Sequence, residues 1–118
     1  ELSAPVIPIA VDGYDASKPP IIVPAFVDSG SDGTLLPMDV LDAVGAEYAD
    51  TVRLRGVAGG VQRLDRYTVR ISVGREAVQA VSALATAAGS EALIGRDVIN
   101  HLVVTLNGPA GATELQTK

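Results

Sequence analysis

Residues 26–34 read Phe26-Val27-Asp28-Ser29-Gly30-Ser31-Asp32-Gly33-Thr34, and this stretch decides the fold. An apolar run at residues 21–27 leads directly into the carboxylate, which is typical of a buried strand that ends in a tight loop. Asp28 then lies at the inner end of a strand, where a charge is costly unless the molecule uses it. An Asp-Ser-Gly turn is common by itself, so the rest of the chain must decide between a plain turn and a functional loop.

Composition limits the class of protein. The chain has 118 residues, 47% of them apolar and 19% charged, which predicts a single folded domain over residues 1–118. Aromatic residues are only 3%, so we expect a core of Val, Leu, Ile and Ala. A net charge of -5 argues against nucleic acid or an anionic membrane as a partner. The absence of cysteine excludes disulfides and thiolate metal sites.

No apolar stretch is long enough, and free enough of Pro, Gly and charge, to span a bilayer, so we expect no membrane segment. No signal peptide is visible in the sequence as given, and the cell compartment stays unknown.

The N-terminal half alternates short apolar runs with turns. Residues 5–11 are strand-like, but Pro5 and Pro8 confine them to an edge or terminal strand. Residues 12–20 are rich in turn formers and predict a loop. A short helix is expected from Pro37, which suits a helix start, to just before Gly45, which suits the residue past a helix end.

The second half predicts a hairpin followed by short elements. Alternating patterns at residues 51–55 and 61–73 flank a Gly-rich tip at residues 56–60, which indicates a β-hairpin. Residues 77–85 are Ala-rich with a helix-like spacing of apolar residues, so propensity alone favours a helix. We expect a short helix from Arg96 to Leu102. Strands are expected over residues 103–106 and 113–116.

A carboxylate in such a loop becomes useful when a second one joins it. Two acids in one site cannot both ionise comfortably, so one stays protonated and the pair holds an acid and a base together. Such a pair can activate a water and protonate a carbonyl oxygen. The chain contains Asp-Ser-Gly once, so only a second copy of the chain, related by a two-fold axis, can supply the partner Asp28.

Three motifs together resemble the retropepsin-like aspartic proteases, the single-domain relatives of pepsin. Residues 28–34 resemble the catalytic loop of that family. Residues 93–97, Leu93-Ile94-Gly95-Arg96-Asp97, resemble its second signature, and residues 56–60 resemble the tip of its flap. The motifs follow the family order and spacing. Residues 93–97 and 103–109 look more like bacterial, cellular or retroelement members than retroviral ones.

The resemblance implies an all-β, closed-barrel aspartic protease fold with a flap hairpin and one or two short helices. It also implies a homodimer that hydrolyses peptide bonds in extended peptide or protein substrates, without a cofactor or metal. On the basis of this resemblance, we expect residues 77–85 to form a strand rather than a helix. Gly33 stands where retroviral members more usually have a polar side chain, and the chain beyond Pro109 is longer than theirs.

The resemblance also implies a role for each motif residue. Asp28 would be the catalytic residue, with Ser29 and Gly30 completing the active-site loop. Asp32 would form a partly buried pair with Arg96. The implied substrate-binding residues are Ser31, Asp32, Gly33, Val57, Ala58, Gly59 and Gly60. The implied structural supports beneath the loop are Leu93, Ile94, Gly95 and Arg96.

Two other interpretations remain open. A protease-like dimerisation or peptide-binding module would keep the fold without the activity. A calcium-binding loop over residues 28–39 is a remote second, since Gly30 supplies no ligand and Asp39 replaces the usual Glu. His101, the only histidine, has no partner ligand nearby in sequence and indicates no metal site. Asp97 is read as a solvated residue or a helix cap.

Overall fold

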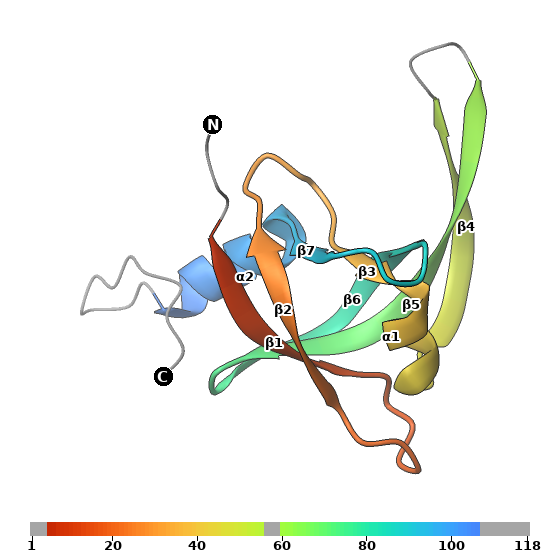
Figure 1. The fold of residues 1–118 in the computed structure, drawn as a ribbon. Coiled ribbons are helices and arrows are strands. Elements are labelled where there is room, and N and C mark those ends of the chain that lie inside the picture. Colours follow the sequence, from red (N-terminus) through yellow and green to blue (C-terminus); the bar gives the residue numbers. More distant parts are fainter. Residues whose placement is uncertain (1–4, 56–59, 107–118) are drawn as a thin grey trace.

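The computed structural model describes residues 5–55 and 60–106, and Figure 1 shows a strand-rich molecule with two short helices in these ranges. Its elements are β1 (Val6–Asp12), β2 (Ile21–Val27), β3 (Leu35–Pro37), α1 (Met38–Ala43), β4 (Glu47–Arg55), β5 (Val61–Val73), β6 (Glu76–Thr86), β7 (Ala92–Ile94) and α2 (Arg96–Leu106). The strands follow the order β1-β2-β7-β3-β6-β5-β4. Because β1 also pairs with β5, six strands close into a barrel and β4 adds to β5 outside it. The predicted all-β closed barrel is confirmed.

β1 and β2 form the antiparallel start of the barrel, with Val6 opposite Phe26 and Val11 opposite Ile21. Residues 10–12 of β1 also pair with β5, whereas residues 6–9 pair with β2 alone. Pro8 lies among residues 6–9, whose other side pairs with none of the described strands. Its missing N–H therefore removes no ladder hydrogen bond on that side. The expectation of an edge strand is therefore right for the first half of β1.

α1 follows β3 without a loop. Pro37 occupies the N-cap with an extended ψ of 149°, and Gly45 follows the C-cap Val44 with a φ of 66°. Only glycine adopts that left-handed conformation at no steric cost. The predicted helix between these two residues is confirmed.

The β4–β5 hairpin extends beyond the barrel in Figure 1. β4 begins at Glu47, four residues before the strand that the sequence predicted, and β5 matches its predicted span. β6 is a strand, as the resemblance indicated and against its helix propensity. It pairs with β5 over most of its length, and this pairing outweighs a per-residue preference of a few tenths of a kcal/mol.

The prediction of a strand over residues 103–106 is wrong, because α2 continues through them to Leu106. The turns of α2 that precede these residues present carbonyls to their N–H groups, so continuing the helix adds a hydrogen bond per residue. A strand would have needed a new partner. The strand expected over residues 113–116 lies outside the described residues. None of the helices in the described ranges is long and apolar enough to cross a membrane.

One aliphatic core fills the barrel, as the composition predicted. Its largest fully buried apolar side chains come from both halves of the chain: Ile9, Leu36, Leu41, Ile71, Ile94 and Leu102. Thr34 is the fully buried polar residue among those described. It directly follows the Asp28 loop, so the core reaches the base of the candidate site.

Candidate active site

β2 places Asp28 at the rim of the barrel. The Asp28 N–H donates to the carbonyl of Ile94, 3.1 Å away, and this bond continues the parallel pairing of β2 with β7. Its side chain is half-buried, and its Oδ1 accepts the N–H of Gly30 at 2.9 Å. A Cβ on Gly30 would lie 3.2 Å from the same oxygen, so a glycine lets the loop turn tightly around the carboxylate. Ser29 is exposed beside it.

The second half of the loop is attached to the start of α2 by its backbone. Arg96 N–H donates to the carbonyl of Ser31 at 2.8 Å, and Asp97 N–H donates to that of Asp32 at 3.3 Å. A Cβ on Gly95 would lie 2.5 Å from the Gly33 oxygen and 2.7 Å from the Ser31 oxygen. Gly95 is therefore required for this close contact, which no side chain larger than hydrogen permits. The expected support by Gly95 thus has a steric basis.

Asp32 and Arg96 form the expected ion pair, but it is not partly buried. The Asp32 side chain is 86% exposed and the Arg96 side chain 52% exposed. Solvent screens such a pair, which typically contributes less than about 1 kcal/mol. The expectation of burial is wrong because the loop and α2 approach each other through their backbones, which leaves both side chains in solvent.

A partly buried contact between the buried Thr34 and the exposed Asp97, which the sequence did not predict, lies behind the loop. The Thr34 hydroxyl donates to Asp97 Oδ1 at 2.8 Å, and the Thr34 N–H donates to Asp97 Oδ2 at 3.3 Å. The same hydroxyl accepts the Gly95 N–H at 3.3 Å, and Asp97 Oδ1 also accepts the Val98 N–H at 2.8 Å. Asp97, the second residue of α2, thus accepts an N–H of the first helical turn and also holds the end of the Asp28 loop. The signal for this contact in the sequence was a polar residue, Thr34, directly before the apolar residues Leu35 and Leu36.

β7 supplies the remaining support. Leu93 pairs with Phe26 on one side and with Leu35 on the other, and Ile94 is fully buried. β7 thus holds the strand before the loop and the strand after it at a fixed separation. Leu93 and Ile94 thus lie beside the strand that leads to Asp28, and Leu93 also lies beside the strand that follows the loop.

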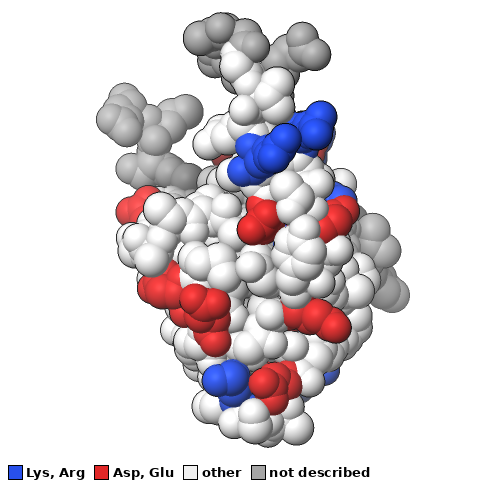
Figure 2. Space-filling view, turned by 90° about the vertical axis from the view of Figure 1, so that its right-hand side faces the viewer, with Lys and Arg blue, Asp and Glu red and all other residues white. Residues whose placement is uncertain are grey.

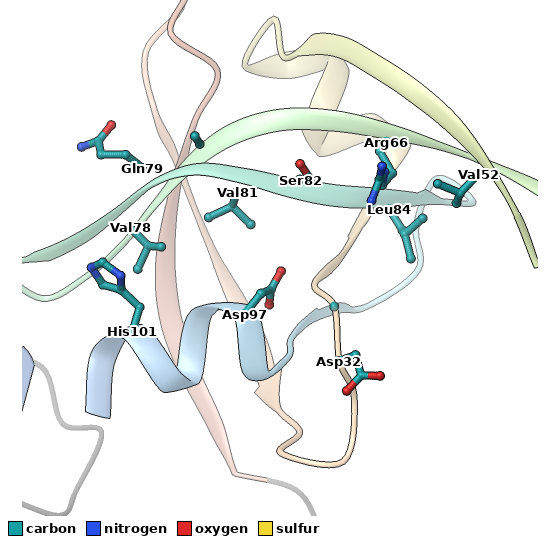
Figure 3. Close-up of a pocket in the computed structure, with 12 residues that line it drawn as sticks. Asp32, Val52, Arg66, Val78, Gln79, Val81, Ser82, Leu84, Asp97 and His101 are labelled. Atoms are coloured by element: carbon teal, nitrogen blue, oxygen red, sulfur yellow. The ribbon is translucent and has the colours of Figure 1, made fainter. Parts of the chain in front are cut away.

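A cavity of about 680 Å³ opens next to the loop (Figure 3). Asp32 and Gly33 contribute to it from the loop, Val52 from β4, and Asp97 and His101 from α2. β6 supplies Val78, Gln79, Ala80, Val81, Ser82 and Leu84. The lining along β6 is mostly apolar, with Gln79 and Ser82 as its polar members, and the lining along α2 is polar.

The charges of the molecule are unevenly placed. Figure 2 shows Lys and Arg gathered near the outer end of the β4–β5 hairpin, above a face where Asp and Glu are scattered. Arg53 and Arg63 are exposed cross-strand partners there. Nearer the barrel, Arg66 donates two hydrogen bonds to Asp50, of 2.7 and 2.6 Å. The outer part of the β4–β5 hairpin is thus basic, unlike the chain as a whole.

Comparison with protein families decides the class. A family model described as aspartyl protease matches residues 7–98, which include the Asp28 loop and the run at residues 93–97. The chain belongs to the aspartyl protease family. A comparison with curated proteins gave no match.

Solved structures similar to this chain show the same fold at low identity. The EIAV protease complexed with the inhibitor HBY-793 is 18% identical, with a TM-score of 0.62 over 85% of this chain and 88% of that one. The simian foamy virus (mac) protease is 20% identical, with a TM-score of 0.57 over 81% and 94%. The retroviral protease-like domain of Ddi1 from Leishmania major is 19% identical, with a TM-score of 0.53 over 91% and 86%. The chain is therefore retropepsin-like in fold.

The remaining expectations fall on other parts of the chain. Val57, Ala58 and Gly59 lie outside the described residues, and Gly60 directly precedes β5. The carboxylates of the calcium alternative do not converge, since Asp28 accepts from Gly30, Asp32 pairs with Arg96, and Asp39 Oδ1 accepts the Gly89 N–H at 3.0 Å. Within the described ranges, no three His, Cys, Asp or Glu side chains are grouped to hold a metal.

Proposed function

We propose that this chain is an aspartic endopeptidase that acts as a homodimer, with one Asp28 from each subunit in a single active site. The observation that carries the proposal is the half-buried Asp28 at the end of β2, in a loop fixed by β7 and α2, in a chain of the aspartyl protease family. One chain offers one such carboxylate, and the chemistry needs two.

The two Asp28 carboxyl groups would share one proton, because like charges this close do not both ionise. The ionised group takes a proton from water as the water oxygen attacks the scissile carbonyl carbon. The protonated group gives its proton to the carbonyl oxygen, which forms a tetrahedral diol. The C–N bond then breaks as one carboxyl gives its proton to the nitrogen and a diol hydroxyl returns its proton to the other carboxylate, which releases an amine and a carboxylic acid and leaves one shared proton.

Two exposed groups beside the loop support association there. Val6 is 52% exposed, and the adjoining Pro5 carbonyl accepts the Val27 N–H at 2.8 Å, so β1 begins next to the loop. Ser29 is also exposed at the loop tip, where it would bond across the two-fold axis. An exposed apolar side chain at this point is what a subunit interface would bury.

The β4–β5 hairpin would cover the substrate, with residues 57–60 contacting its backbone and Ser31, Asp32 and Gly33 binding it from below. Among the described strands, β4 and the outer part of β5 pair only with each other, so the hairpin makes no strand pairing with the described barrel at that end. A lid of this kind shields the reacting bond and its attacking water from bulk solvent.

Digestion of a peptide library by wild type and Asp28→Asn tests the proposal. The asparagine oxygen can still accept the Gly30 N–H, so the variant should fold and associate normally, while hydrolysis falls by roughly a thousandfold. Asp42→Asn, which removes an exposed carboxylate on α1, is the matched control and should keep full activity. Equal turnover by folded Asp28→Asn would refute the catalytic role. Peptide binding by a wild type that never releases product would favour the silent peptide-binding module.

A further inference from the structure

The cavity beside the Asp28 loop continues away from it as a groove between β6 and α2. In Figure 3, β6 runs along one side, with Val78 and Val81 directed towards α2, while Asp97 and His101 project from α2 towards β6. The end nearest the loop is lined by Asp32 and Gly33. A Cβ on Gly33 would meet nothing within 4 Å, so nothing obstructs the passage from loop to groove at that residue.

β6 has an unpaired backbone edge in this groove. Its residues 84–86 pair with β3, but residues 77–83 pair only with β5 among the described strands. The Leu84 N–H donates to the Thr34 carbonyl at 2.9 Å, so residue 84 directs its backbone groups away from β5. Backbone direction alternates along a strand, so Ser82, two residues earlier, presents its N–H and C=O to the same side.

The unpaired edge ends at a β-bulge. Gln79 and Ala80 together oppose Arg70 of β5, since Val69 pairs with Val81 and Ile71 with Val78. Ala80 has a φ of 56°, and its N–H donates to the Tyr14 hydroxyl at 2.9 Å. The Ala80 N–H is thus already hydrogen-bonded, so Ser82 is the residue that presents its backbone N–H and C=O to the groove.

The side chains around Ser82 suit an added strand. Ser82 is exposed, Val78 and Val81 are buried, and Leu84 is half-buried. An extended polypeptide laid beside β6 would make two backbone hydrogen bonds to Ser82 and place an alternate side chain over this apolar wall. The same polypeptide could continue over Gly33 into the Asp28 loop.

We propose that this groove, with the backbone of Ser82 at its centre, binds an extended segment of the substrate remote from the bond that is cleaved. The inference rests on the proposed function, because it treats the occupant as part of the polypeptide held at Asp28. The substrate segment would add to β6 as a further strand, so long, unfolded chains should be better substrates than short peptides.

Ser82→Pro is the direct test, with Ser82→Ala as its matched control. Proline removes the N–H that faces the groove and leaves the β5 pairing of the neighbouring residues, whereas alanine keeps the N–H. A cleaved peptide from the library is synthesised at full length and trimmed to about four residues on each side of the scissile bond. Ser82→Pro should raise KM for the long peptide about tenfold, with kcat unchanged. The trimmed peptide should be cleaved equally by all three proteins.

Two results would overturn the proposal. One is that Ser82→Pro cleaves the long peptide as well as wild type does, or that the substitution impairs cleavage of the long and the trimmed peptide equally. The other is a change of oligomeric state in Ser82→Pro without peptide, which would mean that a second copy of the chain occupies the groove. Thermal unfolding checks the fold of each variant. If Ser82→Pro does not fold, His101→Trp, which fills the groove from α2, replaces it with His101→Ala as control.

A binding measurement separates this proposal from the proposed function. Labelled casein, an unfolded protein, is titrated into Asp28→Asn with and without Ser82→Pro. Binding weakened about tenfold by Ser82→Pro supports the groove even if wild type cleaves nothing. Unchanged binding overturns the groove even if wild type is a protease.

Discussion

Replacing Thr34 by valine tests how the Asp28 loop is held. Valine has nearly the same shape, so packing in this fully buried site is kept while the hydroxyl is lost. Two hydrogen bonds disappear: the one donated to Asp97 at 2.8 Å and the one accepted from Gly95 at 3.3 Å. The change therefore isolates the polar contact between the loop and α2.

The expected cost follows from those two bonds. A hydrogen bond to a charged group contributes about 1.5 to 3 kcal/mol, and a buried N–H left without a partner costs about 1 to 3 kcal/mol. The second bond is long, so we expect a loss of about 3 kcal/mol in the free energy of unfolding. Thr34→Ser keeps the hydroxyl and removes one methyl group, which costs about 1 kcal/mol. The two variants should differ by about 2 kcal/mol.

Urea unfolding measures this difference. With a slope of about 2 kcal/mol per molar, the midpoint of Thr34→Val should fall by about 1.5 M and that of Thr34→Ser by about 0.5 M. Activity per folded molecule should fall more in the valine variant, because Gly95 and Asp97 also hold the loop backbone. A valine variant as stable as the serine variant would mean that the contact between Thr34 and Asp97 does not stabilise the loop.

Three further changes have distinct expected outcomes. Arg96→Ala should lower the free energy of unfolding of one subunit by less than about 1 kcal/mol, because the pair with Asp32 is exposed; a loss above 3 kcal/mol by urea unfolding would contradict this. Gly60→Val should leave the thermal midpoint unchanged, since a Cβ there meets nothing within 4 Å, yet lower turnover if the hairpin is a lid; unchanged turnover would argue against a lid. The Tyr14 N–H, with Arg70, holds the pKa of Asp12 below its usual range, and Arg66 does the same for Asp50. Both carboxylates then stabilise the fold above their unfolded pKa of about 4, and this is lost as pH falls through the folded values; urea midpoints that rise from pH 5 to pH 3 would contradict it.

The motifs predicted the parts of the site that depend on local geometry. Asp28 at a strand end, Gly95 under the loop and the helix that begins at Arg96 all follow from short sequence patterns with a steric or hydrogen-bonding reason. The extent of α2 did not, because Val103, Val104 and Thr105 have strand propensity, and only the preceding helical turns decide their conformation.

Contacts between distant segments were the least predictable. The pair of Asp32 and Arg96 was predicted, but its exposure depends on how closely two backbones approach. The contact of Thr34 with Asp97 joins residues 63 positions apart. Nothing in the sequence indicated a role for Tyr14. Its hydroxyl accepts the Ala80 N–H and donates to Gln79 Oε1, at the bulge that ends the unpaired edge of β6.

The central claim is that two chains form one active site, and mixing subunits tests it most directly. Wild type is diluted through a wide concentration range, and separately mixed with increasing amounts of Asp28→Asn that are allowed to exchange. Association and activity are linked by mass action, so specific activity should fall on dilution. It should also fall as the inactive subunit is added in excess, because mixed dimers carry one carboxylate. A monomeric species that cleaves peptide at constant specific activity across the dilution series, unaffected by Asp28→Asn, would contradict the account.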